Sequence, residues 1–302
     1  MPGSATSDRE KVTTGIVMMC VGVALLCTND ALAKFLVADY PALQILFLRN
    51  VIALPVAVLL TVRMSGAAAL RSHRPVAHLV RGILWIGATV LFFTSFLYLE
   101  LAEATALIFV APLFITAISA VVLRERVGPR RWLAVCVGFV GVLIVIRPGT
   151  SAFQTVSLLP VLTAFIYALL MLSARWVDSR ESVWTMLLYL TGTSALLSAC
   201  VVPFVWQPVR AGDLWLFAAI AVFGTAGMTL MTQAFRLAPA AIVAPFDYTG
   251  LIWATAFGWL IWTEVPDATA FVGAAVIIAS GVFVIWREGR AGRSPYPDDH
   301  PG

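Results

Sequence analysis

Four ionisable side chains lie inside stretches of sequence that are otherwise apolar. Asp30 and Lys34 stand in one such stretch, Arg49 in the next, and Asp247 in a later one. A charged side chain near the centre of a membrane-spanning helix costs about 2.5–3.5 kcal/mol on insertion scales, so it usually serves a purpose. Acids and bases in that setting can form ion pairs, exchange protons or hold the charged groups of a solute.

Asp30 has several candidate partners. Lys34 lies four residues later on the same helical face, with the acid first, which is the favourable order for an ion pair within a helix. Arg49 is expected at a similar depth in the membrane, which permits a pair with Asp30 or a network of all three residues. Asn29 adds an amide beside the carboxyl group. Structural pairing and direct handling of a solute or proton are both open interpretations.

A polar stripe runs along one face of the apolar stretch 214–233 and the residues that follow it. Because such a face would be costly against lipid, it should look toward another helix or a cavity. Positions 136 residues earlier are Thr89, Phe93 and Phe96, a mixed hydroxyl and aromatic face. A cavity between these faces would suit a small amphiphile, and hydroxyl bonds between helices are the competing interpretation. The stripe consists of Thr225, Thr229, Thr232, Gln233 and Arg236.

Four aromatic residues, Trp85, Tyr167, Tyr248 and Trp253, lie deep inside apolar stretches, and we expect them near a cavity. Other tryptophans stand near the ends of such stretches, where they usually anchor a helix at the membrane interface. The sequence has no H-E-x-x-H, P-loop or nucleophile-elbow pattern, which disfavours an enzyme and an ATP-driven pump. The four cysteines form no C-x-x-C pair, so neither a metal nor a cofactor is expected.

The elements that must position these residues are membrane-spanning helices. Hydrophobic residues make up 61% of the chain and charged residues 12%, whereas a soluble domain has about 25% charged residues. A helix needs about twenty apolar residues to cross a bilayer. Ten stretches meet this length, so we predict an all-α integral membrane protein with no room for a soluble domain beside the spans. The predicted spans are Gly15–Val37, Ala42–Val62, Leu79–Tyr98, Ala104–Leu123, Arg131–Ile146, Leu158–Val177, Val183–Pro203, Leu214–Gln233, Ala240–Trp262 and Ala268–Trp286.

The distribution of basic residues predicts the orientation of these spans. If the N-terminus is inside, sixteen of the twenty lysines and arginines fall on the cytoplasmic face, two on the other face and two within spans. Cytoplasmic loops retain Arg and Lys, so both termini should be cytoplasmic and the number of spans even. This topology also explains the sequence pI of about 9.1, so no nucleic-acid partner is expected.

The chain contains an internal duplication at an offset of about 136 residues. The segment 101–106 (LAEATA) corresponds to 237–242 (LAPAAI), and each is followed by a proline and then by a span that closes on an acid. We expect repeats at 12–149 and 157–287 and a cytoplasmic tail at 288–302. Five spans per repeat is an odd number, so the repeats must enter the membrane in opposite orientations. Inverted repeats are characteristic of secondary transporters, with the site near the midplane between the halves.

The duplication suggests roles for three acidic residues. Glu125 and Glu264 end the fourth and ninth spans at opposite faces, where paired gate or capping roles compete with simple solvation of the helix ends. Asp247 follows Pro245, and its counterpart region, 108–111, is wholly apolar. An acid that occurs in only one repeat is not required by a scaffold that both repeats share. We therefore expect Asp247 to function in transport, with a water-facing acid near the inner mouth as the alternative.

The sequence resembles the drug/metabolite transporter superfamily, and within it the EamA-type ten-span carriers. The resemblance covers 15–286 and is carried by the Ala-rich entry, proline and terminal Glu of spans four and nine and by the Gly-rich spans five and ten. It implies a ten-helix inverted-repeat carrier of small organic solutes, similar to the YddG-type exporters of amino acids. These motifs identify the scaffold rather than the solute.

We therefore predict a bacterial inner-membrane carrier that works by alternating access and exports amino acids and related metabolites. Uptake or exchange of a nucleoside- or cofactor-like metabolite is the nearest alternative, and a membrane enzyme acting on lipid is the alternative of another class. The predicted partners are the solute and the lipid bilayer. Small residues of spans five and ten, among them Gly141 and Gly273, could pack against an internal helix or form a homodimer.

Overall fold

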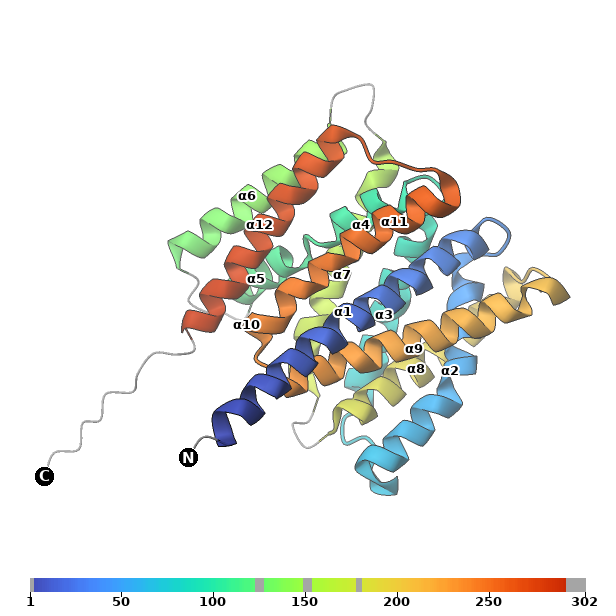
Figure 1. The fold of residues 1–302 in the computed structure, drawn as a ribbon. Coiled ribbons are helices and arrows are strands. Elements are labelled where there is room, and N and C mark those ends of the chain that lie inside the picture. The colour runs from blue at the N-terminus through green and yellow to red at the C-terminus, as the bar shows by residue number, and fades with distance from the viewer. Residues whose placement is uncertain (1–2, 123–127, 149–153, 178–180, 292–302) are drawn as a thin grey trace, which may run out of the picture.

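The computed structural model describes residues 3–122, 128–148, 154–177 and 181–291, and all regular structure within these ranges is helical (Figure 1). Seven helices are long and apolar enough to cross a membrane, and Trp132–Ile146 and Ala268–Val284 are shorter apolar helices. The ninth span, over residues 240–262, is divided into shorter pieces. The fold is thus all-α, with ten transmembrane segments built as two inverted five-helix repeats.

Each repeat contains one divided span among continuous ones. The first repeat comprises α1 (Gly3–Val37), α2 (Ala42–Ser65), α3 (Pro75–Ser95), α4 (Leu101–Ile108) with α5 (Ala111–Val121), and α6 (Pro129–Ile146). The second comprises α7 (Leu158–Leu172), α8 (Val183–Val201), α9 (Leu214–Leu237), α10 (Ala240–Val243) with η6 (Ala244–Thr249) and α11 (Gly250–Trp262), and α12 (Ala268–Ala291). The connecting 3₁₀ turns are η1 (Ala67–Leu70), η2 (Thr155–Ser157), η3 (Ser173–Trp176), η4 (Val202–Phe204) and η5 (Ala211–Asp213).

The fourth and ninth spans are broken near their middles, which corrects the prediction of continuous helices over Ala104–Leu123 and Ala240–Trp262. In the fourth span α4 ends at Ile108, and Pro112 stands in the first turn of α5. Proline has no N–H, and its ring clashes with the carbonyl four residues earlier, so it kinks or breaks a helix. In the ninth span Pro245 stands in the first turn of the 3₁₀ segment η6.

The two repeats are packed into each other. The most extensive contacts between helices join α1 to α9, α6 to α12, α2 to α8 and α3 to α7, and each of these pairs takes one helix from each repeat. Figure 1 shows two of these pairs side by side, α1 with α9 and α6 with α12. Any site between the repeats is therefore enclosed by helices from both.

Glycines allow two of these helix pairs to approach closely. A Cβ added to Gly141 would lie 3.0 Å from the carbonyl oxygen of Gly273, and one added to Gly273 would lie 2.8 Å from that of Gly141. Gly22 of α1 and Gly227 of α9 face each other in the same way. The predicted small-residue faces of spans five and ten are thus in contact within one chain. A homodimer through those faces stays a prediction that one chain cannot test.

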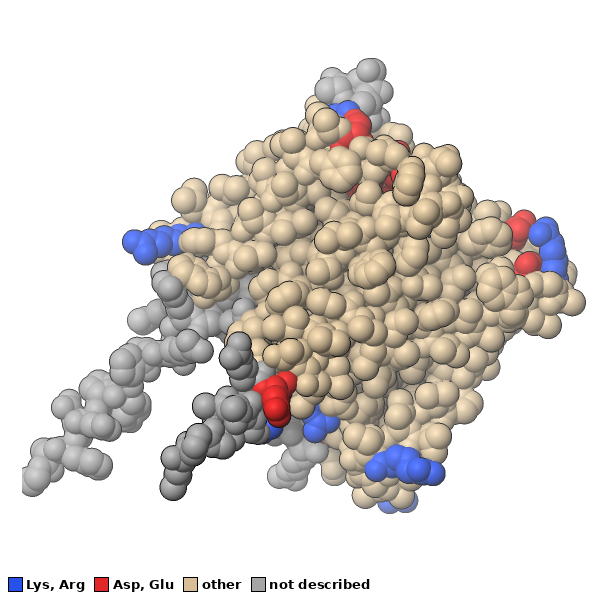
Figure 2. Space-filling view, in the orientation of Figure 1, with Lys and Arg blue, Asp and Glu red and all other residues tan. Residues whose placement is uncertain are grey.

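The surface has two charged edges separated by an apolar band. Figure 2 shows Lys, Arg, Asp and Glu gathered at opposite edges of the molecule, with uncharged residues between them. Large apolar side chains of the membrane-spanning helices are exposed, such as Leu196 at 69% and Leu260 at 68%, as expected for residues that face lipid. The first described turn of α1 and the last of α12 lie at the same edge (Figure 1), which we name the near face. The opposite edge is the far face.

Candidate functional site

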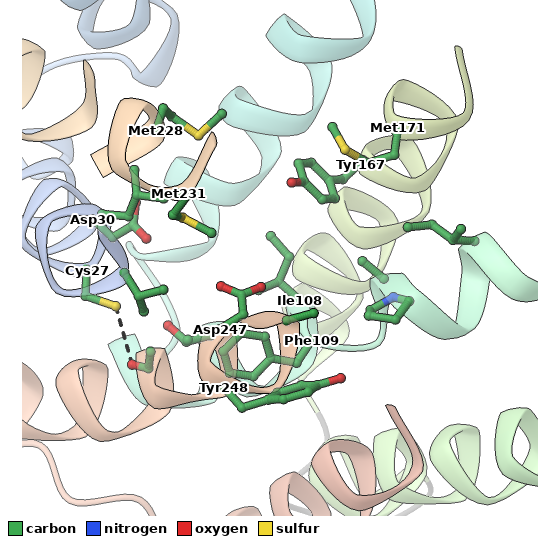
Figure 3. Close-up of a pocket in the computed structure, with 18 of the residues that line it drawn as sticks. Cys27, Asp30, Ile108, Phe109, Tyr167, Met171, Met228, Met231, Asp247 and Tyr248 are labelled. Atoms are coloured by element: carbon green, nitrogen blue, oxygen red, sulfur yellow. Dashed lines mark hydrogen bonds between the residues drawn. The ribbon is translucent and has the colours of Figure 1, made fainter. Parts of the chain in front are cut away.

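A cavity of about 430 Å³ lies between the two repeats (Figure 3). It draws side chains from α1, α3, α7, α9 and α12 and from both broken spans. The lining residues are Val23, Leu26, Cys27, Asp30, Phe92, Thr105, Ile108, Phe109, Ala111, Pro112, Ile115, Thr116, Tyr167, Met171, Met228, Met231, Phe235, Ala244, Asp247, Tyr248, Gly250 and Val284. This volume lies in the range of small-molecule sites, which is about 300–1,000 Å³.

Both helix breaks lie at the cavity wall. Ile108, Phe109 and Pro112 come from the break in the first repeat, and Asp247 and Tyr248 from the break in the second. Non-helical backbone at membrane depth is tolerated where it is buried in protein or lines a cavity. Discontinuous helices at a repeat interface are also how many secondary transporters build their solute sites. The breaks thus place backbone groups as well as side chains at the cavity.

Two carboxyl groups, those of Asp30 and Asp247, face the cavity from α1 and η6 (Figure 3). The Nδ2 group of Asn29 donates a hydrogen bond of 2.9 Å to Oδ1 of Asp30. The Asp247 side chain makes no hydrogen bond or ion pair with the described residues. Two described lining residues are acidic and none is basic, so the cavity has the charge to attract a cationic group.

The remaining walls are aromatic and methionine-rich. The rings of Phe109 and Tyr248 pack edge to face, with centroids 5.0 Å apart. The side chains of Met171, Met228 and Met231 line the cavity on other sides (Figure 3). Methionine is flexible and polarizable, so such a wall can adapt to solutes of different shapes. The cavity therefore combines two acids with an adaptable apolar surface.

An ion pair between the repeats lies on the far side of this cavity. Lys34 Nζ donates to both carboxylate oxygens of Glu264, at 2.6 Å and 2.5 Å, and to the carbonyl oxygen of Leu99 at 3.2 Å. The ammonium group also lies 5.1 Å from the centre of the Trp262 ring. Glu264 in turn accepts a hydrogen bond of 3.3 Å from the backbone N–H of Leu101, the first residue of α4.

This arrangement decides against one of the candidate pairs from the sequence, the one between Asp30 and Lys34. Lys34 lies one helical turn farther toward the far face than Asp30, and its ammonium group reaches Glu264 instead. Asp30 keeps its neighbour Asn29 and the nearby charge of Arg49. Glu264 is thus an ion-pair partner rather than a freely solvated helix end. Its counterpart Glu125 lies outside the described residues.

Two further ion pairs join the repeats at the far face. Arg147 pairs with Asp267, and Arg210 Nη1 lies 3.0 Å from Asp39 Oδ2. Asp267 also begins α12, where its Oδ1 accepts a hydrogen bond of 2.8 Å from the N–H of Ala270. The bond from Arg147, followed by that from Ala270, lowers the pKa of Asp267 from 3.8 to about 2. Several ion pairs therefore connect the two repeats at the far face.

The predicted site residues divide into three groups. Asp30, Tyr167, Asp247 and Tyr248 line the main cavity. Arg49, Trp85 and Thr225 line a second, smaller cavity between α2, α3, α8 and α9. The others line neither cavity: Asn29, Lys34, Thr89, Phe93, Thr229, Gln233 and Trp253.

Members of the third group have other surroundings. Phe93 is buried in the core and stacks on Phe96, and Trp253 is 39% exposed and stacks on Phe257. The hydroxyl of Thr229 is buried and makes no hydrogen bond to the described residues. The wall that α9 presents to the main cavity is formed by Met228, Met231 and Phe235 rather than by the polar stripe. Arg236 is exposed and forms no ion pair with Asp247.

Several cavity residues were not among the predicted site residues. They are apolar or weakly polar, and they include Phe92, Phe109, Met171, Met228, Met231 and Phe235. In a membrane protein such residues have the same composition as lipid-facing and core positions, so composition gives no signal. The helix-breaking prolines gave a usable signal, because Pro112 lies at the cavity wall and Pro245 immediately follows the lining residue Ala244.

The fold and cavity define a class of protein, the inverted-repeat membrane transporters with a site at broken helices. Comparison with known proteins then places the chain within that class. The family model described as "EamA-like transporter family" matches it twice, over 13–147 and 154–286. The chain belongs to this family of small-molecule transporters, and this membership points to a transporter rather than an enzyme.

Characterised relatives differ in solute and direction. The chain is 28% identical to a pseudopaline exporter of Pseudomonas aeruginosa, covering 88% of this chain and 94% of the relative. It is 28% identical to an S-adenosylmethionine uptake transporter of Rickettsia prowazekii, covering 91% and 93%. It is 32% identical to a riboflavin transporter of Vibrio cholerae, covering 80% and 81%. A solved crystal structure matches the fold with a TM-score of 0.62 at 19% identity, covering 93% of this chain and 99% of that one.

Proposed function

We propose that this protein is a secondary transporter of the bacterial inner membrane that moves small organic solutes by alternating access. The observation that carries this proposal is the placement of two carboxyl groups, Asp30 and Asp247, on one apolar cavity bounded by both helix breaks. The near face is assigned to the cytoplasm, because the sequence places sixteen of twenty basic residues there.

The solute class follows from the chemistry of the wall. Two acids without a basic lining residue favour a solute with a protonated amino group, and the aromatic and methionine side chains favour an apolar body. Amino acids and related metabolites combine both features. We propose export of such solutes as the physiological direction, by resemblance to the amino-acid exporters.

A second candidate is uptake or exchange of a nucleoside- or cofactor-like solute. The paired rings of Phe109 and Tyr248 offer a surface on which a flat heterocycle could stack. The names of the S-adenosylmethionine and riboflavin transporters among the relatives support this candidate. S-adenosylmethionine also carries an amino group and a sulfonium charge, so one cavity could serve both classes.

Alternating access requires a part that opens and closes. We propose that the Lys34–Glu264 pair is the gate on the far side, since it joins α1 of one repeat to the end of α11 in the other. In the proposed cycle the cavity opens to the near face while the pair is formed. Separating the pair would let the two repeats rock apart at the far face and expose the solute there.

The test is transport by the purified protein in proteoliposomes. The panel contains labelled leucine, methionine, phenylalanine, S-adenosylmethionine and riboflavin, each with and without an imposed pH gradient. Saturable counterflow of an amino acid, lost in Asp30→Asn, supports the proposal. Counterflow restricted to riboflavin would favour the second candidate. Protein-dependent conversion of lipid without solute movement would refute both.

A further inference from the structure

The second cavity contains buried donors that lack acceptors. It measures about 30 Å³ and lies between four helices of both repeats. Arg49 is 8% exposed and Asn50 is 4% exposed, and both line it. The lining residues are Arg49, Asn50, Ala53, Trp85, Leu187, Leu190, Thr191, Gly224, Thr225 and Met228.

Few contacts stabilise the charged guanidinium of Arg49 inside the protein. Its guanidinium lies 5.7 Å from the centre of the Trp85 ring and interacts with the charge of Asp30. It makes no hydrogen bond to the residues that the structure describes. Nδ2 of Asn50 is likewise buried without a hydrogen-bond partner among them. A buried donor without an acceptor is costly, so the Asn50 amide beside a guanidinium with no described hydrogen bond indicates room for an acceptor with negative charge.

Gly224 makes room for this guanidinium. A Cβ added at this position would lie 2.7 Å from Oδ1 of Asn29 and 3.0 Å from Nη2 of Arg49. Asn29 and Arg49 therefore meet over one glycine, next to Asp30. A positive group and a negative group are thus available side by side, at the partition between the two cavities.

Met228 forms that partition, because it lines both cavities. It is a flexible side chain that can change rotamer without moving the backbone. A cavity needs about 10–15 Å³ per water molecule, so the smaller one has room for about two waters or one carboxylate group. The body of a solute must then stay in the main cavity.

We infer that the cavity lined by Arg49 and Asn50 is a carboxylate subsite, which binds the acidic end of a zwitterion whose ammonium group lies at Asp30. This inference rests on the proposed function and narrows its solute class from amines to α-amino acids. In an α-amino acid one carbon atom separates the two charged groups, which suits the adjacent charges of Asp30 and Arg49, provided that the Met228 side chain turns out of the partition when the solute binds. A guanidinium can bind a carboxylate through two parallel hydrogen bonds, and the Asn50 amide adds a third donor.

The experiment compares each amino acid with the amine that lacks its carboxylate. Binding to purified protein is measured by calorimetry for phenylalanine and phenethylamine, leucine and isoamylamine, and methionine and 3-methylthiopropylamine. Wild-type protein should bind at least one amino acid roughly tenfold or more tightly than its amine, the factor expected for one charge-assisted contact. Arg49→Gln should remove this preference without weakening the binding of the amine, because the variant also removes a cation beside Asp30.

Asn50→Leu provides a second variant that leaves the buried charge in place, and Val51→Leu, a change at an exposed residue of α2 outside both cavities, provides the control. If Arg49→Gln does not fold, loss of the preference in Asn50→Leu alone supports the subsite. Equal binding of amino acid and amine by wild type, or an unchanged preference in Asn50→Leu, would overturn the subsite but not the proposed function. Failure of all six compounds to bind would reject the amino-acid class itself, and the subsite with it.

Discussion

Lys34 of the first repeat and Glu264 of the second form an ion pair in which Nζ lies 2.5 Å from Oε2. The two residues are 230 positions apart in the chain, and the pair also contacts the start of α4 through Leu101. One ion pair thus connects α1, the entry to the first broken span and the exit from the second. Any movement that opens the far face must break it.

We predict that Glu264→Gln weakens the closed far face. Removing one partner of a largely buried pair leaves the other charge uncompensated. A shift of 1–2 kcal/mol changes the population of the far-open state roughly 5-fold to 30-fold. The measurement is labelling of a cysteine introduced at buried Ala102 by a membrane-impermeant reagent added from the far side.

The matched control for the gate is Asp39→Asn, because the Asp39–Arg210 pair also joins the repeats at the far face but is exposed. Exposed ion pairs contribute little, so its labelling rate should stay near that of wild type. The exchanged pair Lys34→Glu with Glu264→Lys should restore slow labelling. Labelling that is fast in both single variants would assign the effect to general loosening of the far face.

We predict that Asp247 couples transport to protons. A neutral carboxyl crosses a low-dielectric constriction far more easily than a carboxylate, and Asp247 has no described partner to hold it charged. Asp247→Asn should abolish the response of transport to an imposed pH gradient, while counterflow, which needs no net proton movement, survives. A response that persists in Asp247→Asn and vanishes in an Asp30→Asn protein that still performs counterflow would reverse the assignment. Absence of any response in wild type would mean a facilitative carrier.

The Asp267–Arg147 pair predicts a specific loss of stability in acid. Because the pKa of Asp267 is lowered from 3.8 to about 2 in the folded protein, its contribution is present above pH 3.8 and is lost as the pH falls through 2. Asp267→Asn should retain the helix cap and lack this acid-dependent part of the melting temperature. Asp267→Ala should also lose the cap, at about 1 kcal/mol. Melting curves of both variants between pH 7 and pH 2 test this.

Close packing of α6 on α12 predicts that Gly141 tolerates no side chain. A Cβ there would lie 2.9 Å from a side-chain atom of Ile277 and 3.0 Å from the Gly273 carbonyl oxygen. Gly141→Val should therefore destabilise the single chain by about 1–3 kcal/mol. Gly87→Ala is the control, because its Cβ would meet its nearest neighbour at 3.8 Å. A purified Gly141→Val protein that keeps its thermal stability but changes from dimer to monomer would instead support a dimer through this face.

The charge distribution predicts that both termini are cytoplasmic. The measurement is labelling of single cysteines at positions 4 and 294 with an impermeant reagent, in intact and in opened cells. Residue 294 lies outside the described residues, and the test depends only on its side of the membrane. Both should react after opening and not before. Reaction of either in intact cells would contradict the orientation and reverse the assignment of the near face to the cytoplasm.

Hydropathy and duplication were sufficient to predict the scaffold. Apolar runs of about twenty residues have one stable form in lipid, so the number and order of helices follow from the sequence. The repeat offset predicted the inverted arrangement because each half has an odd number of spans. The prolines at 112 and 245 marked the positions of the breaks, although their effect on the helices was not foreseen.

The partners of the charged residues required the tertiary structure. Within one helix Lys34 and Asp30 are favourably spaced, but the competing partner Glu264 comes from the other repeat, and no local rule reveals that contact. The polar stripe of α9 was visible in the sequence, whereas its neighbours were not. Thr225 faces the small cavity beside Arg49, and the adjacent methionine face forms the wall of the main cavity.

The sequence by itself thus determined that this protein lies in a lipid bilayer, that it has ten spans in an inverted duplication, and that acids lie at membrane depth. Those properties depend on composition and on spacing along single helices, and both can be read residue by residue. The tertiary structure decided which acids share a cavity, which cation pairs with Glu264 and where Arg49 lies. These depend on the register between helices of different repeats, which is set by contacts such as Gly141 with Gly273 across more than a hundred residues of chain.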